Sequence, residues 1–137
     1  MSQVTDLSGP LYEGMWSYRG LAGIPDSLHA FAVDRIAAVD THGFEAFDYR
    51  MSSITGTYIE TGGHMLNGMP TLNELPLSGF LRPAVVCHVP RKHPQEVIHG
   101  SELETYCPPV QEGDALLIEC GWGAHWGKPD FVSAGPA

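Results

Sequence analysis

Residues 54–64 read ITGTYIETGGH, and three of them carry side chains that could act on a small substrate. Histidine exchanges a proton near neutral pH, so His64 is predicted to act as a general acid or base. Glu60 could serve as a base or could orient the imidazole of His64. A phenol can hold a carbonyl or polarise a developing oxyanion, and Tyr58 is therefore predicted to bind the substrate.

Three residues outside this segment are further candidates for contact with the substrate. Aromatic rings pack well on flat molecules, which makes Trp16 and Trp122 predicted substrate-binding residues. His125 lies beside a third tryptophan and could add a polar group. Each candidate has a structural alternative. His64 could hydrogen-bond to the loop backbone, Glu60 could be an ordinary loop carboxylate, and the tryptophans could pack in the core.

The strands that position these residues are expected to be short, because 16 glycines and 11 prolines divide the chain. The apolar runs PAVVCHVP at 83–90 and QEGDALLIECGW at 111–122 predict two buried strands. Residues 47–60 are rich in β-branched and aromatic side chains and predict a strand that runs into a loop. Residues 29–40 could form a strand or a helix.

Helices are expected to be few. A short helical turn and a connection are predicted within residues 72–83, which end at a proline. A short helix is predicted after Ser101, with Ser101 as N-cap and Glu104 completing a capping box. Several strands with short helices favour a mixed or mostly β fold.

Charge and cysteine content narrow the possible partners. The formal net charge of −9 argues against nucleic acid, which is bound by basic patches. Apolar runs long enough to cross a membrane are absent from the sequence, so no membrane partner is expected. The three cysteines, Cys87, Cys107 and Cys120, form no close-spaced pair, which predicts reduced thiols in a cytoplasmic protein. Cys87 and Cys120 lie in apolar runs and are interpreted as buried, inert thiols.

The chain resembles the cyclase family of metal-dependent hydrolases, which includes bacterial kynurenine formamidase and isatin hydrolase. The family motif, H-x-G-T-H-x-D-x-P-x-H, aligns with residues 54–64, where Gly56, Thr57 and His64 match. The flanking segments DLSGPLYEGM, GMPTLNELPLSGFLRPAVVCHV and VQEGDALLIECGW are also similar to the family. The resemblance therefore covers nearly the whole chain.

This resemblance implies a zinc or manganese site formed by two histidines and an aspartate of the motif. Here Ile54 and Tyr58 stand at the histidine positions, and Glu60 replaces the aspartate. Isoleucine has no lone pair to donate, and a protonated phenol is a poor ligand. Glu60 and His64 alone are too few ligands for a tight site. No metal cofactor is therefore expected at this motif.

The fold that the resemblance implies is α/β, a single swivelling β/β/α cyclase-like domain over residues 1–137 with a β-barrel-like core. Relatives continue with further strands, a helix and further metal or catalytic residues, so the chain is expected to lack the C-terminal part of the family fold. A sheet without that part would leave open edges, which invite pairing. The expected partner is a second copy in a homo-oligomer or another chain that supplies the missing half.

The resemblance implies a hydrolase or cyclase-like enzyme of secondary metabolism. Its substrate would be a small amide, lactam or carbonyl compound, and its chemistry would use acid and base groups in place of the metal. The alternative is a catalytically silent subunit that completes or stabilises an active partner chain. A small-ligand binding module is a third possibility.

Overall fold

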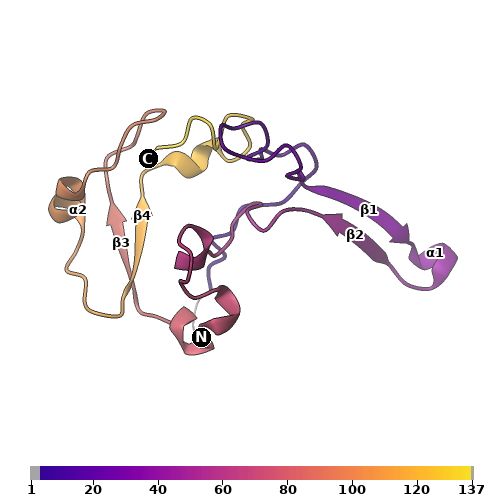
Figure 1. Ribbon diagram of the computed structural model, residues 1–137, viewed down its shortest axis with the longest axis horizontal. Coiled ribbons are helices and arrows are strands. Elements are labelled where there is room, and N and C mark those ends of the chain that lie inside the picture. The colour runs from indigo at the N-terminus through magenta and orange to yellow at the C-terminus, as the bar shows by residue number, and fades with distance from the viewer. Residues whose placement is uncertain (1–3, 137) are drawn as a thin grey trace. The chain divides into compact units, whose positions relative to one another are not determined.

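The computed structural model describes residues 4–136, which divide into two compact units. Unit 1 contains the chain up to Tyr58 together with His125–Ala134, and unit 2 is built mainly from Ile59–Ala124. Each unit holds one two-stranded sheet (Figure 1). The predicted α/β class is confirmed. Over the described residues, however, the strands form two small separate sheets, and the predicted barrel-like core is not present.

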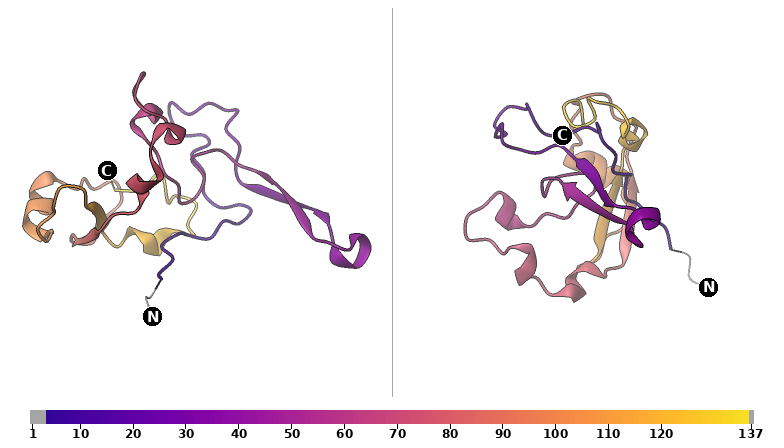
Figure 2. Two further views of the ribbon diagram at one scale, coloured as in Figure 1. Left: turned by 90° about the horizontal axis from the view of Figure 1, so that it is seen from below. Right: turned by 90° about the vertical axis from the view of Figure 1, so that its right-hand side faces the viewer.

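Unit 1 contains an antiparallel hairpin of β1, Ala32–Ala37, and β2, Ala46–Arg50. The short helix α1, Val39–His42, joins the strands at the tip of the hairpin (Figure 2). Gly43 ends α1 with a φ of 76°, a left-handed conformation that favours glycine. Residues 29–40 therefore contain both of the alternatives that the sequence left open, a strand followed by one turn of helix.

The core of unit 1 is aromatic and centres on Trp16, which is buried together with Met15 and Phe31. The indole of Trp16 stacks on Phe131 at a centroid distance of 4.9 Å and meets Trp126 edge-on at 5.0 Å. Such ring pairs contribute beyond the apolar area that they bury. Residues 125–134 are therefore held to the N-terminal part of the chain by ring contacts.

Unit 2 contains a parallel pair, β3 at Ala84–His88 and β4 at Ala115–Glu119. The helix α2, Gly100–Tyr106, lies in the crossover between them, as parallel strands require (Figure 1). Both strands predicted from apolar runs are confirmed. The short helical turn predicted within 72–83 is also confirmed, and the structure forms two 3₁₀ helices there, Leu72–Glu74 and Leu77–Phe80.

The start of α2 differs from the prediction by two residues. His99 precedes the first helical residue, and its backbone N–H donates to the carboxylate of Glu102 at 2.9 Å. Ser101 already lies inside the helix, where its carbonyl accepts a hydrogen bond from Thr105. The predicted cap at Ser101 with Glu104 is therefore wrong, because the helix begins two residues earlier than expected and Glu102 is the residue that reaches back to the N-cap backbone.

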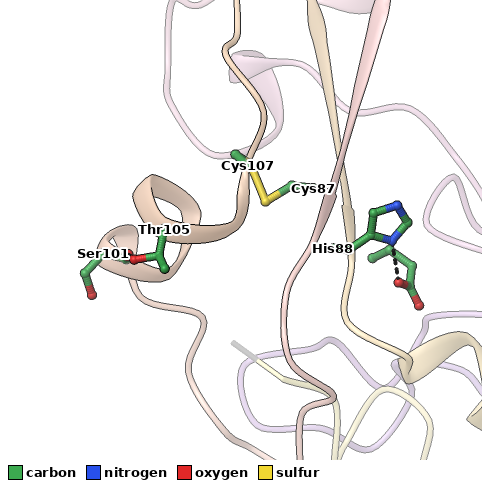
Figure 3. The surroundings of a disulfide bond; sticks show 6 residues. Cys87, His88, Ser101, Thr105 and Cys107 are labelled. Atoms are coloured by element: carbon green, nitrogen blue, oxygen red, sulfur yellow. Dashed lines mark hydrogen bonds and ion pairs between the residues drawn. A yellow bond between two sulfur atoms is a disulfide. The ribbon is translucent and has the colours of Figure 1, made fainter.

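A disulfide joins Cys87 of β3 to Cys107, the residue that follows α2 (Figure 3). The two Cα atoms are 4.4 Å apart, and Cys87 is fully buried. The prediction of reduced thiols is therefore wrong for this pair. Cys120 carries a free thiol, but it is only partly buried and not fully buried as predicted. The pairing could not be read from the sequence because 20 residues separate the cysteines, and only the return of the chain through α2 brings them together.

A buried lysine links the segment after β3 to α2. The Lys92 side chain is only 3% exposed, and its ammonium group donates to Glu102 at 2.6 Å and to Glu96 at 3.2 Å. The pKa of Glu102 is held below its usual range, mainly by the hydrogen bond that its carboxylate accepts from Lys92. A hydrogen bond from the backbone of His93, followed by that from Lys92, lowers the pKa of Glu96. The hydrogen bond to Glu102 raises the pKa of Lys92.

These shifts predict how stability depends on pH. The side chains of unfolded glutamates titrate near pH 4.3. The contribution of the Glu96 and Glu102 carboxylates to the free energy of unfolding is therefore present above that pH. It is lost as the pH falls through their lower folded-state pKa values. Because its pKa is raised in the folded protein, Lys92 also contributes to the free energy of unfolding. This contribution is present below the ordinary pKa of lysine and is lost as the pH rises through the raised value. Urea unfolding should therefore show a difference between wild type and Lys92→Met that shrinks in acid.

The matched control for this prediction is Arg35→Met. Arg35 pairs with Glu45 at 2.7 Å, but both side chains are about half exposed. Exposed pairs contribute little to stability, so this variant should unfold like wild type across the pH range. A difference between wild type and Lys92→Met that does not change with pH would mean that Lys92 acts through packing alone.

Candidate functional site

The end of the motif is a tight turn that depends on glycine. Residues Gly62–His64 form one turn of 3₁₀ helix, and the backbone N–H of Gly63 donates to the carbonyl of Pro70 at 3.3 Å. A Cβ atom at Gly63 would lie 3.0 Å from the carbonyl oxygens of both Met69 and Pro70. Gly63 therefore permits the close approach of these two segments, which fixes the backbone that carries His64.

The turn brings the two predicted catalytic residues together within unit 2. Nε2 of His64 lies 3.2 Å from Oε1 of Glu60. The side chains are 42% and 39% exposed, so water and small molecules can reach both of them. A carboxylate in this position can orient the imidazole. The pair can thus accept a proton and return it, as general acid–base chemistry requires.

Tyr58 and Trp16 belong to one aromatic group in unit 1. The hydroxyls of Tyr58 and Tyr18 are 3.2 Å apart, and the ring of Tyr18 meets the ring of Trp16 edge-on at 6.2 Å. Sequence reasoning did not select Tyr18, and the one signal for it was the density of aromatic residues around Trp16. The structure therefore adds Tyr18 as the residue that connects two of the predicted substrate-binding side chains.

The indole N–H of Trp16 is an unusual donor. Trp16 is only 5% exposed, and within residues 4–136 its Nε1 is a buried side-chain nitrogen without a hydrogen-bond partner. Buried donors in native structures nearly always have a partner, so an orphaned one calls for an explanation. Trp16 is thus a packed core ring, one of the two alternatives that the sequence left open, and its role in substrate binding stays a prediction.

Trp122 and His125 occupy the two ends of one 3₁₀ helix but belong to different units. Trp122 is 8% exposed and is part of unit 2. His125 is part of unit 1, where its Nδ1 lies 3.1 Å from the ammonium of Lys128. The structure therefore brings together Glu60 with His64, and Tyr58 with Trp16 through Tyr18. The predicted roles of Trp122 and His125 stay predictions.

The motif residues do not fit a metal ion. Ile54 offers no donor atom, and the hydroxyl of Tyr58 is hydrogen-bonded to that of Tyr18. Glu60 is paired with His64. The described part of the chain contains no group of three or more side chains of histidine, cysteine, aspartate or glutamate that could hold a metal ion. The zinc or manganese implied by the family motif therefore has no matching set of ligands in residues 54–64.

The segment before Tyr58 is anchored to the start of unit 1. The backbone N–H of Gly9 donates to the hydroxyl of Thr57 at 3.0 Å. Gly56 has a φ of 69°, and the side chain of Leu11 occupies the space that a Cβ atom would need there. Gly56 and Thr57, the matching residues of the family motif, thus have structural roles in positioning Tyr58.

The comparison with known families identifies the class of protein. The chain matches the family model described as "Putative cyclase" over residues 5–137. Because this match spans nearly the whole chain, the protein belongs to the cyclase family, and the predicted resemblance is confirmed. No curated protein and no solved structure matches the chain significantly.

None of the helices in the described residues is long and apolar enough to span a bilayer.

Proposed function

We propose that this member of the cyclase family is an enzyme that acts on a small amide, lactam or carbonyl compound by acid–base chemistry. The observation that carries the proposal is the pair of Glu60 and His64, with 3.2 Å between the carboxylate and the imidazole. The pair stands where the family motif ends, and its exposure leaves it accessible to a substrate. The chemistry would not use a metal bound by the motif.

In the proposed hydrolysis, His64 removes a proton from water as the water oxygen attacks the carbonyl carbon of the substrate. Glu60 holds the ring in place and stabilises the imidazolium that forms. His64 then returns the proton to the departing nitrogen, so that the carbon–nitrogen bond breaks and an acid and an amine remain. In general terms, such proton transfer accelerates a reaction by about 10²- to 10⁴-fold.

The proposed substrate-binding residues are divided between the two units, and each role is proposed from the residue type and from contacts within its own unit. Tyr58 would donate a hydrogen bond to the carbonyl oxygen, and its contact with Tyr18 would orient the phenol. The unpartnered indole N–H of Trp16 would supply a second donor. Trp122 and His125 complete the proposed set, with roles in packing on the substrate and in polar contact.

Metal removal tests this proposal directly. The probes are N-formylaniline, an aryl formamide, and isatin, a lactam. They represent the amide and lactam substrates that the resemblance to the cyclase family implies. Turnover by the purified chain should be unchanged after exhaustive treatment with a chelator, and metal analysis should find no stoichiometric zinc or manganese. Activity that disappears on chelation and returns with zinc or manganese would contradict the acid–base mechanism.

A second candidate function is a catalytically silent subunit that completes or stabilises an active partner. The observation that favours it is that Ile54 and Tyr58 fill two ligand positions while Gly56, Thr57 and His64 of the motif are retained. A silent subunit would turn over neither probe by itself. It would instead raise the turnover or the unfolding temperature of a catalytically active cyclase-family chain when the two are mixed or co-expressed.

A further inference from the structure

The hairpin of unit 1 has one face that is mainly apolar, apart from Arg35 opposite Phe47, and one face that carries Asp34, Asp48 and Arg50. Alternate residues of a strand point to opposite sides, so Phe47 and Tyr49 share one face of β2, while Asp48 and Arg50 share the other. Phe47 is 41% exposed and Tyr49 is 64% exposed. Val33 lies opposite Tyr49 in β1, which extends the apolar face across both strands.

The outer edge of β2 is open within the described residues, because the sheet contains β1 and β2 alone. A two-stranded hairpin has marginal stability in water, and an apolar edge strand is a template for pairing with another chain. The register between β1 and β2 also destabilises the hairpin. Asp34 of β1 lies directly opposite Asp48 of β2, and like charges in directly opposed positions are destabilising.

The sequence of β2 is self-complementary in one antiparallel register. If Tyr49 lies opposite Tyr49 of a second copy, Asp48 lies opposite Arg50 of that copy, and the same pair recurs on the other side of the two-fold axis. Centring the pairing on Asp48 would place two aspartates together, and centring it on Arg50 would place two arginines together. Charge therefore selects the register centred on Tyr49.

The other edge of the hairpin offers no equivalent register. Pairing of β1 with its copy about Asp34 or about Arg35 would oppose like charges at the two-fold axis. Pairing between these two positions would bring Asp34 and Arg35 together. It would, however, place the apolar face of one hairpin beside the charged face of the other, because directly opposed residues share a face. Registers of β1 centred on Val33 or Ile36 oppose no two charged residues, so the edge of β2 is the one on which charge favours a second copy.

We propose that β2 pairs antiparallel with β2 of a second copy of this chain, centred on Tyr49, to form a continuous four-stranded sheet. Two opposite-charge pairs of Asp48 with Arg50 form across the axis. The Arg50 side chains lie on the same face as the Asp34–Asp48 opposition and offset it. The apolar side chains of both hairpins lie on one face of the joined sheet. This inference goes beyond the proposed function and does not depend on it.

Charge reversal in the full chain tests the proposal by sedimentation equilibrium. Asp48→Arg and Arg50→Asp should each raise the dimer dissociation constant by about 10- to 100-fold, because two attractive pairs become repulsive. The double variant restores opposite charges and should recover dimerisation. Asp48→Arg also faces Asp34 within its own hairpin, so the folded hairpin should be kept. Asp34→Arg makes the same change in charge away from the paired edge and should leave the dimer unchanged.

A cross-link reads the register itself. In a Cys120→Ser background, Tyr49→Cys should form a disulfide between two chains when oxidised glutathione accepts the two thiol hydrogens and becomes two reduced glutathione molecules. Directly opposed Cα atoms are about 4.5–5.5 Å apart, within the reach of a disulfide. Phe47→Cys is the matched control on the same strand and face, and it should not cross-link, because its position opposes residue 51 of the second copy.

Three outcomes would overturn the proposal. The first is a wild-type chain that stays monomeric at about 100 μM, well above the dissociation constants of stable complexes. The second is a dimer that is weakened by Asp34→Arg as strongly as by Asp48→Arg. The third is equal cross-linking at positions 47 and 49. A chain that remains monomeric and binds a different polypeptide through Tyr49 would assign the face to that polypeptide instead.

Discussion

Replacing His64 by alanine is expected to lower kcat for N-formylaniline or isatin by about 10²- to 10⁴-fold, the usual contribution of a general acid–base group. The loss should fall mainly on kcat, because the proposed role of His64 is to move the proton during the reaction. Steady-state kinetics with a circular dichroism spectrum of the same sample would measure it. The fold should be retained, since the imidazole is 42% exposed and the turn is held by its backbone.

The matched control is His88→Ala. His88 of β3 pairs with Glu119 of β4 at 2.9 Å, so unit 2 contains a second histidine–carboxylate pair of the same kind (Figure 3 shows this contact). Its removal should leave turnover unchanged. If His64→Ala and His88→Ala behave alike, the acid–base role of His64 is contradicted. Wild-type turnover that is retained in full by His64→Ala would contradict it as well.

Glu60→Gln separates positioning from proton transfer. The amide can still orient the imidazole but cannot stabilise its positive charge. A smaller loss of kcat than in His64→Ala, together with a changed pH profile of kcat/KM, would support Glu60 as a positioning residue. A pH profile identical to that of wild type would instead leave Glu60 with a structural role only.

Trp16→Ala is expected to lower the free energy of unfolding by about 3–5 kcal/mol, the usual cost of removing a buried large aromatic side chain. Trp16 is 5% exposed and contacts Phe131, Trp126 and Tyr18. Its removal therefore leaves a cavity where residues 125–134 join the N-terminal part of unit 1. Urea unfolding followed by circular dichroism would measure the change. A loss below about 1 kcal/mol, typical of surface positions, would contradict the assignment of Trp16 to the core.

Trp16→Phe distinguishes the ring from its N–H group. Phenylalanine keeps most of the aromatic packing but removes the donor that lacks a partner in the described residues. Most of the stability should remain, while KM rises and kcat stays close to wild type if the N–H binds substrate. An unchanged KM would remove Trp16 from the proposed substrate-binding set and leave it as a core residue.

The strands could be predicted from local sequence because their signals are local. Residues 83–90 and 111–122 are short apolar runs bounded by turn residues, and they became β3 and β4. The sheet topology depends on pairing between distant segments, which no local pattern specifies. The barrel-like core was expected from the family resemblance alone, and over residues 4–136 the strands pair only as β1 with β2 and β3 with β4.

The site could be predicted in part for the same reason. Glu60 and His64 are four residues apart, so a single turn is enough to bring them together, and the structure shows this contact. The contacts of Tyr58 with Tyr18 and of Cys87 with Cys107 join residues 40 and 20 positions apart. Residue types suggested that Tyr58 would be important but could not indicate which side chain it would meet. Likewise, Glu102 pairs with Lys92, which lies ten residues away, and no local pattern indicated this contact.

The bond between Cys87 and Cys107 closes the backbone from β3 through α2 into a ring. A protease that cleaves a peptide bond between the two cysteines therefore opens the ring without releasing a fragment. The nicked protein would migrate as one band on a non-reducing gel and separate into two bands once a reductant is added. Limited digestion analysed both ways would thus report, for any preparation, whether these sulfur atoms are joined.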